Sequence, residues 1–351
     1  FLKFRGEHSL SAEMTNFTNE EFCEARRKYL DAYHISLGGE GFLEKAKEKL
    51  KNPMLLSLFS EVKEGFSNGP ISDIRILELC KDYWSKKIKE LTEGANKYEY
   101  EEAVNFIFTV SKYMRKRRTN SIEISEIEQI TKNYSSSFKN NILPHVYNEG
   151  ILIEEIRTEE EIPIKKVKFM FEEFKEYLMA RKIIDEELDW HNKQDNEILD
   201  DIFKLREGAR IFETTYGVIE YIILLAEIEK NSNLHLKMLK RLAGSGDSRW
   251  QCIACLAIPK FKELHSEMIE LLESLSCSKD VSVLETTGQT LGALSKSIPR
   301  EVFEILSKLV YHSATTVKSI SVQSLLRLPS RYTDKIIPYL KDVASDYRWE
   351  V

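Results

Sequence analysis

Apolar residues recur at three- and four-residue intervals through most of this 351-residue chain, with Glu and Lys frequent between them. This spacing is that of one face of an α-helix. Glycine and proline number only 14 and 8, so few positions interrupt the pattern. We therefore expect a mainly α-helical protein, with helices over residues 19–33, 42–50, 54–65, 71–91, 98–118, 123–131, 135–149 and 172–184.

Several helix ends are marked by the residues that flank them. Thr18 and Glu21 have the spacing of a capping box, in which each side chain accepts a hydrogen bond from the other residue's backbone N–H. The segment Gly38-Gly39-Glu40-Gly41 separates the first two helices, and we interpret it as a connector. Asn52-Pro53 ends the second helix, because proline disfavours a helical conformation in the residue before it. Pro53 then fits the first turn of the next helix.

A β-hairpin is predicted after the helix over residues 135–149. Gly150 is placed to end that helix in a left-handed conformation. Ile151-Leu152-Ile153 and Val167-Lys168-Phe169-Met170-Phe171 are strand candidates, and the charged residues 154–166 between them supply the tip. Three helices followed by a hairpin are typical of a winged helix, which we expect over residues 119–190.

The last hundred residues contain a repeat. Its openings, spaced by 33, 34 and 32 residues, are Asp247-Ser248-Arg249-Trp250, Asp280-Val281-Ser282-Val283, Ala314-Thr315-Thr316-Val317 and Asp346-Tyr347-Arg348-Trp349. Further helices over residues 265–275 and 300–311 lie between them. Two helices per repeat predict a HEAT-like α-solenoid over residues 241–351, in which each pair buries one face by stacking on the next. Residues 191–240 are then a helical connector.

Composition narrows the classes of protein that fit this pattern. The 51 Lys and Arg against 57 Asp and Glu give a net charge of −6, which argues against a nucleic-acid clamp over the whole surface. No apolar stretch approaches the roughly 20 residues of a membrane span, so we expect no membrane contact. The five cysteines are scattered and odd in number, which favours a reducing, cytoplasmic location.

The sequence offers little chemistry of its own. No Gly-x-x-x-x-Gly-Lys-[Ser/Thr] motif is present, so no phosphate-binding P-loop is predicted. No Ser-His-Asp or Cys-His arrangement is supported by the spacing, so we predict no catalytic residues. Cys252-x-x-Cys255 lies in an apolar helix without a second pair of ligands, and we interpret both thiols as packing residues rather than as a zinc site.

One run of basic residues, 112–118, lies at a predicted helix end. Arg115, Lys116, Arg117 and Arg118 are candidates for a nucleic-acid contact or a contact to another domain. Nucleic acid is disfavoured because the following helices are acidic. The candidate recognition helix, residues 135–149, offers only five side chains suited to bases or phosphates: Lys139, Asn140, Asn141, His145 and Asn148.

Three segments together resemble a known family. They are Phe17-Thr18-Asn19-Glu20-Glu21-Phe22, Asn52-Pro53-Met54-Leu55-Leu56-Ser57-Leu58 and Phe169-Met170-Phe171-Glu172-Glu173-Phe174-Lys175-Glu176-Tyr177-Leu178-Met179-Ala180-Arg181. Their order resembles the region that follows the nucleotide-binding core of STAND NTPases, most of all the NACHT-type and prokaryotic antiviral members. The resemblance covers residues 17–184. The start at Phe1, without an initiator Met or a signal-peptide pattern, fits a piece of a longer protein.

The resemblance implies roles for particular residues. Pro53 is similar to the proline of the family's Gly-x-Pro motif, which packs beside the adenine of a bound nucleotide, with Met54 and Leu55 as neighbours. Phe171 occupies the winged-helix sensor position, at which many NACHT proteins have a His that binds the β-phosphate of ADP. The resemblance further implies that ATP or ADP with Mg²⁺ binds the full-length parent, and that this chain alone binds none.

The function implied by the resemblance is the regulatory lid and ligand-sensing arm of an NTPase in prokaryotic antiviral defence. The chain itself is then no enzyme, whereas its parent is an ATPase. Its implied partners are a protein ligand on the C-terminal repeats, the N-terminal NTPase and effector domains, and further copies of itself on activation. Residues 1–70 would form the end of the NTPase module and the helical domain, and residues 71–118 the linking helices.

Two alternatives stay open from the sequence. One is a winged-helix DNA-binding regulator with an α-repeat interaction arm. The other is a plain α-solenoid scaffold, in which the hairpin has no regulatory role. Both share the expected fold class, which is mainly α: a helical domain, a winged helix with a small β-hairpin wing, and a HEAT-like α-solenoid.

Overall fold

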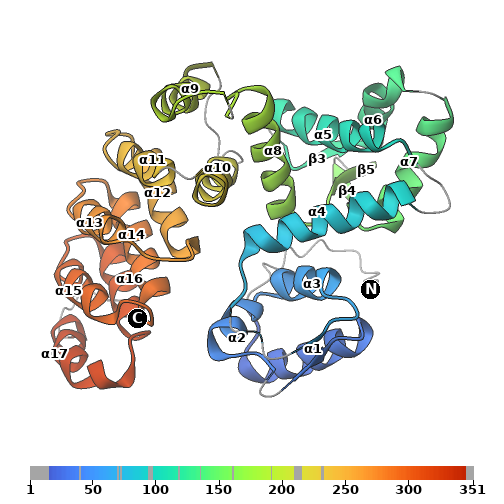
Figure 1. Ribbon diagram of the computed structural model, residues 1–351. Helices are drawn as coiled ribbons and strands as arrows, with labels where there is room; N and C mark the ends of the chain where they lie inside the picture. The colour runs from blue at the N-terminus through green and yellow to red at the C-terminus, as the bar shows by residue number, and fades with distance from the viewer. Residues whose placement is uncertain are drawn as a thin grey trace. The chain divides into compact units, whose positions relative to one another are not determined.

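The computed structural model is mainly α-helical and contains one three-stranded antiparallel sheet within the residues that it describes (Figure 1). These residues are 16–38, 41–68, 71, 73–93, 98–117, 119–134, 136–159, 162–190, 192–208, 216–230 and 233–344. Three parts of the sequence predictions lie outside them: Gly39-Glu40, Arg118 and the fourth repeat opening at residues 346–349. No helix in the described ranges is long and apolar enough to cross a lipid bilayer.

The chain divides into two compact units. The first comprises Phe1–Val110 and Ser121–Phe174, and the second comprises Ser111–Asn120 and Lys175–Val351. The division passes through helices α5 (Tyr100–Arg117) and α8 (Glu172–Glu186). Buried apolar side chains are found in both units, so each has a core of its own.

The first unit begins with a group of four helices: α1 (Asn19–Ala32), α2 (Glu44–Leu50), α3 (Pro53–Val62) and α4 (Ile76–Glu93). The predicted capping box at the start of α1 is confirmed. The N–H of Thr18 donates to Glu21 Oε2 at 2.8 Å, and the N–H of Glu21 donates to Thr18 Oγ1 at 3.3 Å. Leu50, Leu56 and other buried apolar residues fill the space between these helices.

A short parallel strand pair in this group was not predicted. Strand β1 (Ser36–Leu37) pairs with β2 (Ser67–Asn68), and Phe42 forms a further parallel bridge with Ile71. The bridge holds Ile71 outside the helix, so α4 begins at Ile76 rather than at residue 71, and α3 ends at Val62 rather than at residue 65. Strands of two residues are too short for their alternation to be recognised in a sequence.

The rest of the first unit follows the order helix, strand, helix, helix, strand, strand. After α5 come β3 (Ser121–Glu123), α6 (Ile124–Ile130), α7 (Ser136–Asn148), β4 (Leu152–Glu159) and β5 (Ile162–Phe169). The sheet has the order β3-β5-β4, and both pairs are antiparallel. Gly150, at φ 67°, makes the predicted left-handed turn between α7 and β4. The two predicted strands therefore do form a hairpin.

The hairpin is longer than the sequence indicated. Residues 154–159, predicted as part of the polar tip, continue β4. The ion pairs Glu155–Lys168 at 2.7 Å and Glu154–Lys165 at 2.8 Å link the two strands, so charged residues here support pairing instead of ending it. At its other end β5 stops at Phe169, and Phe171 therefore lies outside the strand in which it was predicted.

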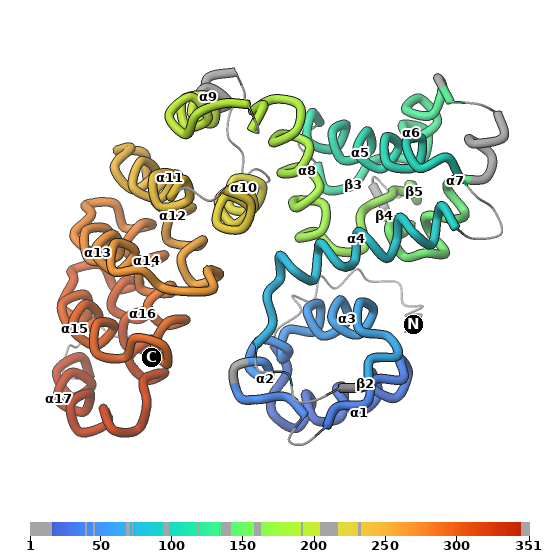
Figure 2. The backbone as a smooth tube through the Cα atoms, viewed as in Figure 1, coloured from blue at the N-terminus to red at the C-terminus, as the bar shows by residue number. Residues whose placement is uncertain are grey.

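The second unit consists of helices in its described part. After α8 come α9 (Asp195–Gly208) and α10 (Tyr216–Glu229), and then an array that Figure 2 shows as successive turns from yellow to red. The array contains α11 (Leu234–Ala243), α12 (Ser248–Ala257), α13 (Ser266–Leu275), α14 (Val281–Leu294), α15 (Pro299–Leu309), α16 (Thr315–Leu325) and α17 (Thr333–Ala344). Helix α14 packs against both α12 and α16, and α11 packs against α13.

The predicted repeat openings within the described residues do begin helices. Asp247 Oδ1 accepts a hydrogen bond from the N–H of Arg249 at 3.0 Å, and Asp280 Oδ1 accepts one from the N–H of Ser282 at 2.9 Å. Ala314 holds the equivalent position before α16 and has no side-chain oxygen to offer. Two of the three helices are thus capped by a carboxylate, which satisfies N–H groups that lack a partner within the helix.

Candidate functional site

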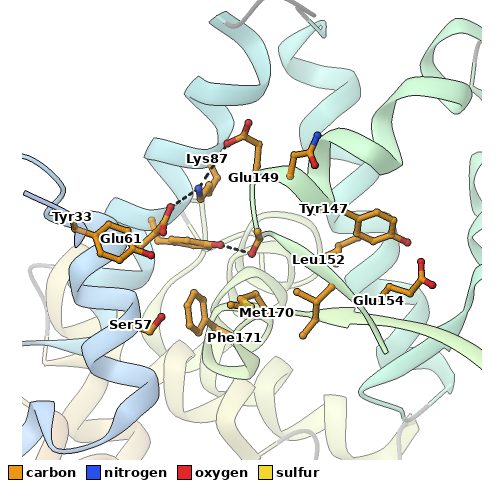
Figure 3. Close-up of a pocket in the computed structure, with 14 residues that line it drawn as sticks. Tyr33, Ser57, Glu61, Lys87, Tyr147, Glu149, Leu152, Glu154, Met170 and Phe171 are labelled. Atoms are coloured by element: carbon orange, nitrogen blue, oxygen red, sulfur yellow. Dashed lines mark hydrogen bonds and ion pairs between the residues drawn. The ribbon is translucent and has the colours of Figure 1, made fainter. Parts of the chain in front are cut away.

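A pocket of about 440 Å³ lies in the first unit. Its walls come from the end of α1, from α3 and α4, from the turn between α7 and β4, and from the residues that follow β5 (Figure 3). It is lined by Tyr33, Ser57, Glu61, Tyr83, Lys87, Tyr147, Asn148, Glu149, Gly150, Leu152, Ile153, Glu154, Met170 and Phe171. The pocket therefore forms where the four-helix group meets the sheet-containing part of the same unit.

Tyr83 of α4 anchors the apolar wall. It is 1% exposed, and its ring meets Phe171 and Phe174 edge-on, at centroid distances of 5.4 and 4.8 Å. Its hydroxyl donates a hydrogen bond to the carbonyl oxygen of Gly150 at 2.8 Å. Edge-to-face aromatic pairs stabilise beyond the area that they bury. Tyr83 thus fixes α4 both to the turn before β4 and to the residues after β5.

A buried ammonium group lies at one rim of the pocket. Lys87 is 4% exposed, and its Nζ donates to Glu61 Oε1 at 2.6 Å and to Glu90 Oε2 at 2.9 Å. Burial opposes its charged form, but the hydrogen bonds to the two carboxylates outweigh burial and raise the pKa of Lys87. Burial also opposes ionisation of Glu61, yet Lys87 and Lys86 lower the pKa of that carboxyl. The Lys87–Glu61 pair is therefore charged at neutral pH.

The pKa of Glu149, on the same rim, is shifted in the direction opposite to that of Glu61. Its Oε2 lies 3.9 Å from Lys87 Nζ (Figure 3). Burial first, and then the hydrogen bond and negative charge of Glu90, raise the pKa of Glu149. A carboxyl group whose pKa is raised in this way keeps its proton to a higher pH than an exposed glutamate does. The rim thus holds the Lys87–Glu61 ion pair beside a carboxyl group, that of Glu149, which binds a proton more readily than an exposed glutamate.

Two tyrosine hydroxyls border the pocket at its ends (Figure 3). Burial, followed by the charge and hydrogen bond of Glu61, raises the pKa of Tyr33 to about 12. Burial, followed by the charge of Glu154, raises the pKa of Tyr147 to about 12. The hydroxyl of Tyr147 is buried and has no hydrogen-bond partner in the described part of the chain. Both hydroxyls keep their protons at neutral pH and can donate.

The residues predicted to contact adenine form the first turn of α3. Asn52 caps this helix, because its Oδ1 accepts hydrogen bonds from the N–H groups of Met54 and Leu55 at 3.0 and 3.1 Å. Pro53 occupies the first helical position. Pro53, Met54 and Leu55 are half-buried, and none of the three lines the pocket. The local prediction for this helix start is confirmed, whereas the adenine contact stays a prediction.

The predicted sensor position does lie in the pocket. Phe171 is buried in its wall against Tyr83. Ser57 and Glu61 line the pocket from α3, four and eight residues after Pro53. Positions four residues apart share a helix face, so Pro53 belongs to the face of α3 that continues into the pocket. Phe171 and Ser57, which lies one turn after Pro53 on α3, therefore line the same pocket.

The candidate basic residues lie in the second unit. Arg115 forms an ion pair with Glu187 at 3.1 Å, while Lys116 and Arg117 are exposed. Arg118, the last of the four candidates, is outside the described residues. Arg117 Nε donates a hydrogen bond to the hydroxyl of Tyr113 at 3.3 Å, so at least two of the three described cations, Arg115 and Arg117, are engaged within the chain.

The candidate recognition helix offers little free chemistry in its described part. Nδ1 of His145 lies 2.6 Å from the hydroxyl of Tyr98, which indicates a hydrogen bond. Asn148 borders the pocket. The side chains of Lys139, Asn140 and Asn141 lie outside the described residues. The contacts of His145 and Asn148 are thus with other parts of this chain, and neither contact favours binding to duplex DNA.

Cys252 and Cys255 act as packing residues between α12 and α14. Sγ of Cys255 lies 3.3 Å from the hydroxyl of Thr287, and burial raises the pKa of Cys255 to about 12. Burial also raises the pKa of Cys252. Metal ligation requires thiolates, which this environment opposes. Among the described residues, no three His, Cys, Asp or Glu side chains are grouped so as to hold a metal ion.

Sequence reasoning missed the buried charge at the pocket. One signal was present, because Lys87 follows Tyr83 by four residues and precedes Leu91 by four, so it falls within the apolar face of α4. A lysine in such a stripe indicates either a buried ion pair or an alkyl chain that reaches solvent. Its partners Glu61 and Glu149 lie 26 and 62 residues away and carry no comparable signal.

Comparison of the chain with protein-family models, with curated proteins and with solved structures finds no match.

Proposed function

We propose that this chain is the regulatory lid and ligand-sensing arm of a STAND-type NTPase, related to the NACHT and prokaryotic antiviral members. One observation carries the proposal: Phe171 packs edge-on against Tyr83. This contact joins the segment after the hairpin to α4, which packs against α3, the helix that begins at the Asn52-Pro53 motif. The sequence resemblance rests on three segments, and two of them, residues 52–58 and 169–181, are thereby linked through α4, as a lid that closes as one piece requires.

We infer that the sheet-containing part of the first unit is a winged helix. The sequence of elements α5, β3, α6, α7, β4 and β5 is the order of that fold, and the sheet order β3-β5-β4 agrees with it. Helix α8 begins directly after Phe171 and supplies the closing motif of the resemblance. In the proposed lid, the sheet-containing part packs on α4 instead of reading a nucleic acid.

We infer that residues 241–351 form HEAT-like repeats, which would serve as the sensing arm. Helices α12, α14 and α16 stack in order. Helices α11, α13 and α15 alternate with them along the chain, so that each repeat contains two helices. A stacked array of this kind exposes a long surface that suits a protein or peptide partner. We therefore propose a protein ligand for this arm.

The proposed activity is a two-state switch. In the resting state the lid closes over a nucleotide-binding core, which would precede residue 1 and hold ATP or ADP with Mg²⁺. Pro53 suits the packing of an adenine ring, because it is rigid, apolar and only half-buried at the start of α3. The core would hold the phosphates, since Phe171 has no hydrogen-bond donor. Ligand capture by the repeats would release the lid and allow oligomerisation in the cytoplasm.

The coding sequence upstream of Phe1 provides the first test. We expect a Gly-Lys-[Ser/Thr] phosphate-binding loop in the same reading frame, on the order of 100 to 200 residues earlier. An initiator codon directly before Phe1 would contradict the proposal, because the lid would then have no core to close on.

Nucleotide retention provides the second test, and the chain offers a matched control. Pro53 and Pro299 both occupy the first position of a helix, so Pro53→Ala and Pro299→Ala should each change stability by less than about 1 kcal/mol. We expect the parent protein to purify with bound ADP, and Pro53→Ala to lose it while Pro299→Ala keeps it. Equal retention by both variants would remove Pro53 from the nucleotide site.

The DNA-binding regulator is the main rival and has its own test. The pairing of Arg115 with Glu187 and of His145 with Tyr98 weighs against it. A salt-dependent gel shift of duplex DNA that disappears when Arg115, Lys116, Arg117 and Arg118 are changed to Glu would favour the regulator. The plain scaffold predicts neither ADP retention nor a gel shift.

A further inference from the structure

The pocket of the first unit has a charge pattern for which the proposed lid has no use. Three carboxyl groups line it, Glu61, Glu149 and Glu154, against the single ammonium group of Lys87. Lys87 is already held by Glu61 and Glu90 at 2.6 and 2.9 Å. An entering anion would therefore find no available ammonium group and would be repelled by the remaining carboxylates.

The charged groups just outside the pocket do not offset the excess of carboxyl groups that line it. Lys86 pairs with Glu64 at 2.7 Å, and Lys165 pairs with Glu154 at 2.8 Å. Each outer ammonium group thus has a carboxylate of its own. Glu90 adds one more carboxyl group on α4, beside Glu149. With these neighbours included, the surroundings of the pocket remain negative even when Glu149 is protonated.

The walls suit the body of an aromatic ligand. Tyr33 borders one end of the pocket, Phe171 and Met170 border one side, and Tyr147 lies at the other end (Figure 3). Aromatic rings carry a negative face that attracts cations. A volume of about 440 Å³ falls within the range of small-molecule sites.

We propose that this pocket binds a small organic cation of the arylalkylammonium class, with its ammonium group at Glu149 and its ring between Tyr33 and Phe171. The ligand's ammonium group takes the place of a proton on Glu149. Because it contacts the end of α1, the turn before β4 and the residues after β5 at once, it holds the four-helix group against the hairpin. The assignment needs only the first unit, so it stands whether or not a nucleotide-binding core precedes the chain.

Three indoles of nearly equal size test the proposal on the 351-residue chain. Tryptamine carries an ammonium group, tryptophol a neutral hydroxyl, and indole-3-propionate a carboxylate. In calorimetric titrations at neutral pH and low salt, we expect tryptamine to bind about tenfold more tightly than tryptophol. We expect indole-3-propionate not to bind. Equal affinity for the three, tighter binding of the anion, or no binding of tryptamine at millimolar concentration would each overturn the proposal.

A pair of variants places the site. Glu149→Gln removes the charge while keeping the size and hydrogen-bonding capacity of the side chain, and we expect it to weaken tryptamine binding about fivefold or more. Glu128→Gln is the matched control, because Glu128 is an exposed carboxylate on α6 and does not line the pocket. An equal loss in both variants, or no loss in Glu149→Gln, would remove the pocket as the site. If Glu149→Gln fails to fold, the order of the affinities of the three indoles for the unchanged chain still tests the proposal.

Discussion

The pocket rim in the first unit and the seam among α12, α14 and α16 in the second are stabilised in opposite ways. At the rim, Lys87 is buried in charged form among carboxyl groups that lie on three different elements. At the seam, small neutral residues bring helices close together, and the buried thiol of Cys255 is kept protonated by burial. Both places are buried, but only one contains charge.

Because of this difference, the pocket rim is suited to a conformational switch, whereas the seam is suited to a rigid structural role. A buried ion pair stabilises only while every partner is present, so proton uptake or a competing ligand can open it. A seam of small residues has no group that titrates near neutral pH, and its close packing resists adjustment. We therefore expect the rim to respond to pH and charged ligands, and the seam to respond to changes of volume.

The strongest test of the comparison is removal of the buried ammonium group. Lys87→Met keeps much of the side-chain volume but leaves Glu61, Glu90 and Glu149 without their shared partner. We expect it to lower the free energy of unfolding of the first unit by about 3 kcal/mol at neutral pH. Lys89→Met is the control, because Lys89 lies on the same helix with its side chain 70% exposed. Urea unfolding combined with hydrogen exchange of α4 measures both.

The effect of Lys87→Met should shrink in acid. The pKa of Glu61 is lowered in the folded state, so its contribution is present above the ordinary pKa of a carboxyl group and is lost as the pH falls through the lowered value. Protonated carboxyl groups no longer need the ammonium group. A penalty that is equal at pH 7 and at about pH 3 would show that Lys87 acts through its volume alone, and the comparison would fail.

The second test adds volume at the seam. A Cβ at Gly292 would lie 2.6 Å from Oγ of Ser324 and 3.1 Å from its Cβ, so Ser324 would have to move and lose its 2.9 Å hydrogen bond to the Gly288 carbonyl. Helix propensity alone favours Ala over Gly by about 1 kcal/mol. We expect the crowding to outweigh that gain, and Gly292→Ala to destabilise the second unit by about 1 kcal/mol.

A double variant identifies the cause of the Gly292→Ala effect. Ser324→Ala removes the hydroxyl that lies nearest to the added methyl group. The two substitutions together should therefore destabilise by less than the sum of their separate effects, as urea unfolding of the four proteins measures. Simple additivity would mean that the seam is looser than the distances indicate.

The third test concerns α11, outside the seam, where one buried histidine should make the array sensitive to pH. Both ring nitrogens of His235 are buried and without a hydrogen-bond partner in the described residues, and its ring lies 5.5 Å from that of Phe261. Burial first, and then the charge of His265, lower the pKa of His235, although Glu227 opposes the shift. The folded state therefore binds fewer protons than the unfolded state as the pH falls below about 6.5.

We expect the melting temperature of α11 and its neighbours to fall between neutral pH and about pH 5, and His235→Phe to reduce that fall while keeping an aromatic ring against Phe261. Circular dichroism melts at several pH values measure the difference. The effect should be smaller than that of Gly292→Ala at neutral pH, since only one group is involved. An unchanged pH dependence in His235→Phe would assign the titration to other groups.

What the sequence predicted correctly is local. The capping box of Thr18 and Glu21, the Asn52 cap before Pro53 and the left-handed Gly150 each depend on contacts within a few residues, and all three are present. The repeat openings at Asp247 and Asp280 belong to the same class. Such features can be predicted from the sequence because each involves only backbone groups within a few residues of the side chain or glycine concerned.

What the sequence left open is the pocket, since its partners are far apart along the chain. The hydroxyl of Tyr83 reaches Gly150 across 67 residues, and Lys87 reaches Glu61 across 26. No spacing rule links such positions. The length of the hairpin depended on the cross-strand ion pairs Glu154–Lys165 and Glu155–Lys168, which are also not local. Pro53 and Phe171 were chosen by resemblance, and of these two only Phe171 lies in the pocket wall.

The smallest expected effect compares equivalent helix starts within the array itself. Ala314 has the extended backbone of a cap residue, φ −76° and ψ 124°, close to the −86° and 123° of Asp280. Oδ1 of Asp280 accepts from the N–H groups of Ser282 and Val283 at 2.9 and 3.2 Å. Ala314→Asp should therefore cap α16 and stabilise the second unit by about 0.5 kcal/mol, whereas Asp280→Ala should destabilise it by about 1 kcal/mol.

Urea unfolding of both variants, with Ala314→Asn as an uncharged control, separates hydrogen bonding from the interaction of a carboxylate with the helix dipole. A gain shared by Asp and Asn would show that the hydrogen bonds decide, and a gain confined to Asp would show that charge does. If Ala314→Asp gives no gain while Asp280→Ala gives its full loss, the equivalence of the two helix starts is wrong. In that case equivalent positions of different repeats do not have equivalent structural roles. The packing at the seam would then have to be explained separately for each pair of helices.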